Sequence, residues 1–116
     1  MQDFKIQDNL LITNDFSLEF ESKINLIEKV NDLFLVLLEV KKGTKDIDNL
    51  YGVDNNGKVI WRIQSVNDAF GIVQNTPYVA LKVLDADRAQ VTSFFGMRFT
   101  FYIDSGKMLE KECIGW

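Results

Sequence analysis

Residues 49–64 read NLYGVDNNGKVIWRIQ. Two runs rich in apolar and β-branched side chains, Leu50–Asp54 and Lys58–Ile63, flank the triplet Asn55–Gly57. Asn and Gly adopt positive φ at little cost, so this triplet is a strong signal for a tight turn between antiparallel strands. The stretch therefore predicts a β-hairpin, and alternation along its second strand places the large Trp61 side chain in the core.

The same order of residue types recurs near the end of the sequence. The segment 51–61, YGVDNNGKVIW, has its counterpart in the segment 101–110, FYIDSGKMLE. In both, an Asp can close the turn with its side chain and a Gly takes the left-handed position before the returning strand. Glu110 stands where the first copy has Trp61. Two copies are too few for a closed propeller, which needs at least about four blades. The repeat predicts a pair of blade-like sheets packed together, or one strongly twisted sheet folded over itself.

The remaining strand signals recur at short intervals with a period of two. Leu33–Val40 is apolar on both faces, which is typical of a central strand covered on both sides. Along Pro77–Leu84, alternation places Val79, Leu81 and Val83 toward the core. Further strands are expected at 16–20, 89–94, 99–103 and 107–112. The predicted fold is one all-β domain over residues 1–116, an antiparallel meander in two packed sheets or one strongly curled sheet, with two blade-like hairpin repeats.

Two segments do not follow this rhythm. Ile24–Val30 fits either a strand or one helical turn, and its strand neighbours favour the strand. Gln64–Thr76 is the longest expected connection, and loops of this length in compact domains are often functional. Its apolar residues Phe70 and Ile72 either plug one end of the β core or face a partner, and the plug is favoured.

The composition excludes several kinds of chemistry. The chain has no histidine, and Cys113 is its single cysteine. These counts exclude a disulfide framework, a cysteine-rich zinc site and nucleophile pairs that depend on histidine. The sequence also has no glycine-rich phosphate loop, nucleophile elbow or dinucleotide fingerprint. We therefore expect no enzyme, no cofactor and no metal site.

The charge balance indicates the kind of partner. The chain has 13 Lys and Arg against 17 Asp and Glu, a net charge of −4 and a pI near 4.7. The scattered basic residues argue against nucleic acid, whereas an acidic surface suits a basic protein. The longest apolar run, Leu33–Leu38, is far too short to span a membrane. Met1–Ile6 lacks the basic and apolar regions of a secretory signal. We expect a soluble cytoplasmic protein without membrane contact.

Two pairs of aspartates, each two residues apart, are the strongest candidates for a charged site. They are Asp46 with Asp48, and Asp85 with Asp87. Such a pair can share a cation, but Asp is also a standard turn residue and both pairs lie at predicted turns. We therefore interpret them as turn residues that leave carboxylates at the surface.

The stretch Asn49–Gln64 resembles the aromatic–Asp–turn–Gly-Lys–apolar–Trp hairpin of quinoprotein-type propeller blades. Together with Pro77–Val79 and the final FYIDSGKMLEKE at 101–112, it is similar to a group of small bacterial β-rich proteins. Some of these serve as immunity proteins of contact-dependent or other polymorphic toxin systems. The resemblance implies a domain that binds a toxin and occludes it without catalytic residues or a cofactor.

We therefore expect an immunity protein that neutralises a basic toxin domain, and the acidic charge favours a nuclease. The alternative is a non-catalytic β scaffold or complex subunit that mediates protein–protein interaction. Trp116 either closes a sheet edge or anchors the partner. The candidate partner contacts are the acids Asp46, Asp48, Asp68, Asp85 and Asp87, the apolar residues Phe70 and Ile72, and Trp116.

Overall fold

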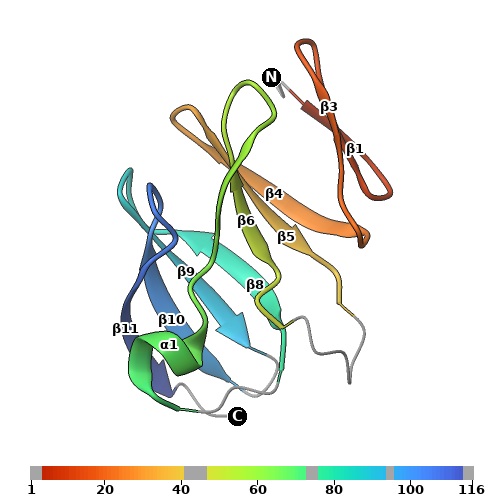
Figure 1. The fold of residues 1–116 in the computed structure, drawn as a ribbon. Coiled ribbons are helices and arrows are strands. Elements are labelled where there is room, and N and C mark those ends of the chain that lie inside the picture. Colours follow the sequence, from red (N-terminus) through yellow and green to blue (C-terminus); the bar gives the residue numbers. More distant parts are fainter. Residues whose placement is uncertain (1–3, 41–46, 73–75, 94–95, 114–116) are drawn as a thin grey trace.

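The structure, a computed structural model, describes residues 4–40, 47–72, 76–93 and 96–113 (Figure 1). These residues form three antiparallel sheets, each with its strands in chain order. The N-sheet consists of β1 (Phe4–Gln7), β2 (Leu10–Thr13) and β3 (Ser17–Glu19). The middle sheet consists of β4 (Ile24–Val30), β5 (Leu33–Leu38), β6 (Leu50–Val53) and β7 (Val59–Arg62). The C-sheet consists of β8 (Tyr78–Val83), β9 (Arg88–Ser93), β10 (Met97–Tyr102) and β11 (Met108–Cys113). The all-β meander is confirmed, and the two repeated hairpins, β6–β7 and β10–β11, lie in different packed sheets.

The middle sheet is the central layer of the stack, as Figure 1 shows. Successive side chains of β5 point to opposite faces because the strand is pleated. Leu35 and Leu37 pack with the C-sheet, whereas Phe34, Val36 and Leu38 pack with the N-sheet. Each fully buried side chain of this kind contributes about 1.5–3 kcal/mol. The prediction of a central strand covered on both sides is confirmed.

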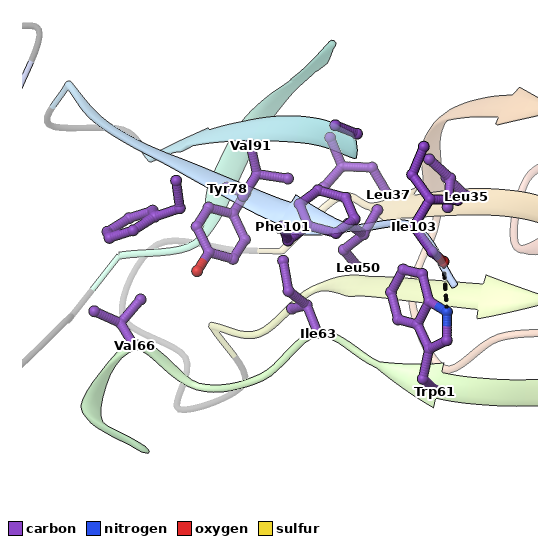
Figure 2. Close-up of a cluster of buried hydrophobic side chains, with 12 residues drawn as sticks. Leu35, Leu37, Leu50, Trp61, Ile63, Val66, Tyr78, Val91, Phe101 and Ile103 are labelled. Carbon is purple, nitrogen blue, oxygen red and sulfur yellow. Dashed lines mark hydrogen bonds between the residues drawn. The ribbon is translucent and has the colours of Figure 1, made fainter. Parts of the chain in front are cut away.

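The glycine that follows each repeated turn receives an aromatic ring from the preceding sheet. Gly57 and Gly106 both have positive φ, +83° and +73°. A Cβ at Gly57 would lie 2.7 Å from the ring of Phe16, and one at Gly106 would lie 2.5 Å from the ring of Trp61. The Trp61 indole Nε1 also donates to the carbonyl oxygen of Ile103 at 2.9 Å (Figure 2). Trp61 is buried as predicted, and its burial joins the middle sheet to the C-sheet.

A buried asparagine makes a second connection between these two sheets. The Asn49 side-chain amide donates to the carbonyl oxygens of Leu38, at 2.7 Å, and Tyr78, at 2.9 Å. Its Oδ1 accepts a hydrogen bond from the backbone N–H of Tyr78 at 2.9 Å. Because Asn49 is 2% exposed, these bonds replace water that the buried groups have lost.

A short helix, α1 (Val66–Phe70), lies within the segment that the sequence assigned to a loop. Ser65 caps its N-terminus by accepting from the backbone N–H of Asp68, and Gly71 ends it in the left-handed conformation. Val66 is 1% exposed and anchors the helix to the core. The helix was missed because five residues are too few to show a helical period. No described helix is long and apolar enough to cross a bilayer.

Two further strand predictions have clear outcomes. Ile24–Val30 is a strand, β4, which agrees with the favoured alternative. The inward orientation of Val79 is wrong, because Val79 is 43% exposed. The register shifts between Tyr78 and Ala80, so a bulge turns Val79 outward and Tyr78 takes the buried position. Leu81 and Val83 pack against the core as predicted.

Candidate protein-binding surface

The turns of all three sheets gather at one end of the stack, toward the top and upper left of Figure 1. We call this surface the turn end and define it by residues 14–15, 31–32, 54–57, 85–87 and 104–106. It lies opposite α1, at the other end of the strands. In a meander every second turn lies at the same end, so the packing of the sheets brings these loops together.

Hydrogen bonds between neighbouring loops tie together the part of the turn end that belongs to the middle sheet and the C-sheet. Asn55 Nδ2 donates to Asp32 Oδ1 at 3.2 Å within the middle sheet. Asn31 Nδ2 reaches the carbonyl oxygen of Ala86, in the C-sheet, at 3.5 Å. The backbone N–H of Ile103 donates to the carbonyl oxygen of Asp87 at 2.9 Å. Loops held in this way lose little further conformational entropy when a partner binds.

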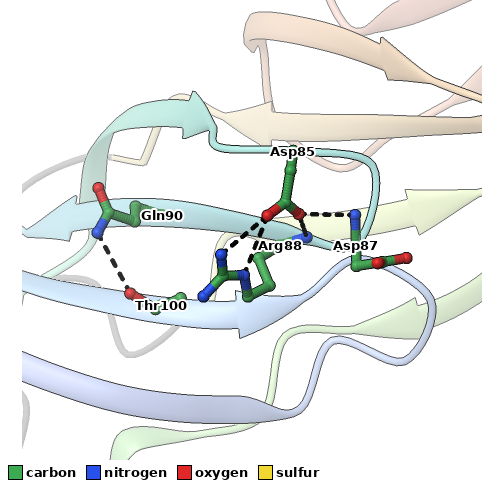
Figure 3. A network of polar contacts seen from close by, with 5 residues as sticks. All are labelled: Asp85, Asp87, Arg88, Gln90 and Thr100. Carbon is green, nitrogen blue, oxygen red and sulfur yellow. Dashed lines mark hydrogen bonds and ion pairs between the residues drawn. The ribbon is translucent and has the colours of Figure 1, made fainter.

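Two aspartates of the turn end hold their own turns. Asp54 Oδ1 accepts from the backbone N–H groups of Asn56, at 2.8 Å, and Lys58, at 3.0 Å. Asp85 Oδ1 accepts from the backbone N–H groups of Asp87 and Arg88 at 2.9 and 2.8 Å (Figure 3). Asp85 Oδ2 forms an ion pair with the Arg88 guanidinium at 2.9 Å. The turn interpretation therefore holds for Asp85.

These contacts also set the charge state of Asp85. The backbone N–H of Asp87 and then the Arg88 side chain hold the pKa of the Asp85 carboxyl below its usual value. Both favour the ionised form, by hydrogen bonding and by opposite charge. The carboxylate stays at the surface while it closes the turn.

Four further aspartates are exposed at the turn end and close no turn of their own. They are Asp15, Asp32, Asp87 and Asp104. The six aspartates of this surface, which include Asp54 and Asp85, lie near the cations Lys29, Lys58, Arg88 and Lys107. The surface is therefore mildly acidic, and hydrogen bonds hold the carboxylates of Asp32, Asp54 and Asp85 in place.

A hollow of about 300 Å³ opens at the turn end between the N-sheet and the middle sheet. Its lining includes Asp15, Asn55, the half-buried Phe16 and the buried Phe34. Lys29 also lines the hollow, and its ammonium lies 5.3 Å from the centre of the Phe34 ring. The hollow thus offers the Phe16 ring to an apolar stem and Asp15 to a cationic head, with the Lys29 cation already beside the Phe34 ring.

The structure separates the partner contacts expected from the sequence into two groups. Asp85 and Asp87 belong to the turn end. The described remainder lies at the opposite end, near α1: Asp48, Asp68, Phe70 and Ile72. Asp46 and Trp116 lie outside the described residues. The expected set therefore does not form one surface.

Structural contacts occupy the group near α1. The Asp48 carbonyl oxygen accepts from Arg62 Nε at 2.7 Å, and Asp68 Oδ2 accepts from Gln64 Nε2 at 3.0 Å. Phe70 stacks on Phe99 with ring centres 6.2 Å apart, and both Phe70 and Ile72 pack against the core. This arrangement matches the favoured plug at one end of the β core.

Sequence reasoning did not single out Asp15, Asp32 or Asp104 as contacts. Asp104 belongs to a turn motif, and the other two lie in short loops without a motif. The signal that could identify these aspartates is their place along the meander, because every second turn lies at the same end of the strands. Among the described residues, no group of three or more Cys, Asp or Glu is placed to hold a metal ion.

Tyr78 is the one described residue with a buried side-chain oxygen or nitrogen that lacks a partner. Its hydroxyl has no hydrogen-bond partner among the described residues, although the residue is 2% exposed. Burial, and to a lesser extent the charge of Asp48, raises the pKa of the Tyr78 hydroxyl above its usual value. Figure 2 shows this hydroxyl beside Val66, in an apolar setting that keeps it neutral.

Two solved structures share the fold. The crystal structure of BamB from Moraxella catarrhalis is similar with a TM-score of 0.64 at 15% sequence identity, over 92% of this chain and 31% of BamB. The crystal structure of the computationally designed Ika8 protein has a TM-score of 0.59 at 10% identity, over 94% of this chain and 35% of Ika8. The chain thus spans about a third of the length of each. At these identities the likeness shows the fold alone, which with BamB is β-propeller-like.

Sequence comparison points to a family but to no characterised relative. No curated protein sequence matches the chain. One family model matches residues 1–113, and its description is "Domain of unknown function (DUF7957)".

Proposed function

We propose that this chain, which belongs to the DUF7957 family, is a non-catalytic domain that binds a basic protein partner through the turn end. The observation that carries the proposal is the set of exposed aspartates on loops tied together by hydrogen bonds, beside a hollow of about 300 Å³. Several carboxylates on one surface steer a basic partner, and hydrogen bonds between the loops of the middle sheet and the C-sheet lower the cost of ordering those loops.

The partner class that we propose is a toxin domain, which makes this protein an immunity protein. The net charge of −4 suits a nuclease, because nucleases carry basic surfaces for their substrate. A lysine or arginine of the toxin would enter the hollow, with its stem on Phe16 and its head at Asp15. Binding would neutralise the toxin by covering its substrate surface, in the cytoplasm where the toxin acts.

A second candidate function is a scaffold or complex subunit without a toxin partner. The observation that favours it is the exposed polar face of the C-sheet, which no other described element covers. The two functions differ in whether a neighbouring gene product is toxic and is neutralised by the domain.

The test is co-expression with the product of the adjacent reading frame in a bacterial host. Growth would measure neutralisation, and calorimetry and stopped-flow mixing at two salt concentrations would measure binding. We expect a one-to-one site whose association slows as salt rises. A non-toxic, non-binding neighbour would contradict the immunity proposal.

Matched variants would test whether the turn end is the binding surface. Asp15→Asn, Asp87→Asn and Asp104→Asn together remove three charges from the turn end. We expect association to slow by about tenfold or more, because steering depends on these charges. The control, Asp8→Asn with Glu19→Gln and Glu39→Gln, removes the same charge at the opposite end of the strands. Equal slowing in both variants would contradict the turn end as the binding surface.

A further inference from the structure

The C-sheet buries one face against the middle sheet and leaves the other uncovered by any described element. Val91, Phe99 and Phe101 point into the core. The alternating positions form polar rows across the outer face, because paired residues of neighbouring strands point to the same side. One row is Lys82, Gln90, Thr100 and Glu110, and the next is Ala80, Thr92, Arg98 and Glu112, while Arg88 pairs with Tyr102.

The two halves of this outer face have opposite character. Over β8 to β10 there is a shallow hollow of about 220 Å³, lined in part by Lys82, Gln90, Thr92 and Arg98. The edge strand β11 carries Glu110, and also Glu112, which pairs with Arg98 at 3.1 Å. Lys82 has no ion-pair or hydrogen-bond partner among the described residues. The face is thus a cationic hollow beside an acidic edge.

The repeat explains why this face does not receive another sheet in the same way. Phe16 of the N-sheet lies on Gly57, and Trp61 of the middle sheet lies on Gly106 of the C-sheet. Glu110 has the corresponding repeat position in the C-sheet, so the face presents a carboxylate where an aromatic ring would continue the series. A surface that covers it must supply a cation.

We infer that the outer face of the C-sheet binds the same face of a second copy of this chain. A twofold axis parallel to the strands lays β8 of one copy over β11 of the other. Lys82 then faces Glu110 of the second copy, while the Gln90 side chains, each of which donates to the buried Thr100 of its own sheet at 3.3 Å, lie near the centre of the interface. The acidic edge enters the cationic hollow twice, once in each direction, as an isologous interface requires.

Charge selects this axis over the other way of packing the two faces. A twofold axis that runs in the plane of the face but across the strands would place Lys82 opposite Lys82 and Glu110 opposite Glu110. Like charges in direct opposition are destabilising. The parallel axis also places Arg88 over the ring of Tyr102, which is 39% exposed, in position for a cation–π contact.

The area of the outer face of the C-sheet sets how tightly the two copies are expected to associate. Four strands spaced about 4.8 Å apart and six residues at about 3.3 Å each give a face of roughly 20 by 20 Å. Two such faces bury roughly 800 Å² in total, less than stable specific interfaces bury, so we expect a weak dimer with a dissociation constant on the order of 100 µM. Because the axis is parallel to the strands, both turn ends point the same way. The dimer would therefore present two turn ends on the same side. The inference of a dimer does not depend on the proposed binding of a basic partner at the turn end.

Sedimentation velocity of the full chain over roughly 1 µM to 1 mM tests the dimer. We expect Lys82→Glu alone, and Glu110→Lys alone, each to raise the dissociation constant by about tenfold or more, because each places like charges in opposition. Combining the two restores opposite charges, and we expect association to return to within about threefold of the natural chain.

The control is Lys58→Glu, which makes the same charge change on an exposed residue of the middle sheet. It should leave the dimer unchanged, as should the triple variant of the turn end. Circular dichroism would confirm that every variant is folded. A natural chain that stays monomeric over the whole range, or a combined variant as weak as either single one, would overturn the inference. Neither result bears on the partner that binds at the turn end.

Discussion

The indole ring of Trp61 lies directly against the backbone of Gly106, where a Cβ would come within 2.5 Å of the ring. The contact joins the last strand of the middle sheet to the last turn of the C-sheet. Gly52 lies against the same indole, so the ring fills a site that only two residues without side chains leave open. The stack therefore depends on glycines for packing as well as for turns.

Gly106→Ala should destabilise the fold strongly. The Cβ would clash with Trp61 and would also be strained at a φ of +73°. Together these effects are expected to lower the free energy of unfolding by about 2–4 kcal/mol. Gly71→Ala is the matched control, since its φ is +69° and nothing lies within 4 Å of its Cβ position. It should cost about 1 kcal/mol. Urea unfolding would measure both, and equal losses would contradict the packing role of Gly106.

Asn49→Ala should weaken the connection between the middle sheet and the C-sheet and so lower the stability of the fold. The change leaves the Tyr78 N–H and the Leu38 carbonyl oxygen buried without their side-chain partner. We expect a loss of about 3 kcal/mol, because each unsatisfied buried group costs about 1–3 kcal/mol. Asn67→Ala, at an exposed position of α1, should change stability little. If urea titrations show that Asn49→Ala lowers the free energy of unfolding no more than Asn67→Ala does, Asn49 does not connect the two sheets as proposed.

Tyr78→Phe should preserve or raise stability, since it removes a buried hydroxyl that has no partner among the described residues. The expected gain at neutral pH is about 1 kcal/mol. Burial raises the pKa of the Tyr78 hydroxyl above its ordinary value of 10.0. The unfolded chain therefore loses this proton first, and the contribution to stability falls as pH rises above about 10.

The phenylalanine variant should lose less stability than the natural chain between about pH 9 and pH 11, where unfolded tyrosine titrates. Tyr102→Phe, at an exposed tyrosine, serves as the control. Chemical denaturation across this range would supply the comparison. Identical pH dependence in the natural chain and in Tyr78→Phe would show that the hydroxyl is not held neutral by burial.

Asp85→Asn should lower the melting temperature near neutral pH, because it removes the charge that pairs with Arg88 and weakens the bonds to two backbone N–H groups. Hydrogen bonds hold the pKa of Asp85 below its ordinary value of 3.8. Its contribution is therefore present above that value and is lost as pH falls through the lower, folded pKa.

The difference in melting temperature between Asp85→Asn and the natural chain should accordingly shrink as pH falls from about 5 to about 2. Asp87→Asn is the matched control, two residues further along the same turn, because it keeps the backbone N–H that Asp85 binds and changes only an exposed side chain. Melting curves in a pH series would decide. A gap that stays constant through acid pH would contradict the role of the ionised carboxylate.

Much of the fold was predictable because its signals are local. The turn at Asn55–Gly57 and the buried position of Trp61 both follow from residues close together in the chain, and both are confirmed. The bulge that turns Val79 outward was not predictable, because it depends on Tyr78 binding Asn49, which is distant in the sequence and lies beside a strand of another sheet. The helix α1 rests on one cap and one buried side chain, Val66, which leave too short a pattern to detect.

The candidate site was less predictable than the fold. Asp85 and Asp48 looked equivalent in the sequence, since both lie at an expected turn. They lie at opposite ends of the strands, and only Asp85 belongs to the turn end. Three strands, β6, β7 and β8, separate the two turns, and an odd number of strands in a meander places two turns at opposite ends.

The sequence by itself determined the strand-forming segments, the turn chemistry, the central position of β5 and the repeat that ends in Glu110 instead of a tryptophan. These features depend on alternation and on residues with special backbone preferences, which act over a few positions. Only the tertiary structure decided that three sheets stack, that Asn49 and Trp61 join them and that the turns meet at one end. Contacts between sheets depend on register, bulges and packing summed over many residues, so no short segment encodes them.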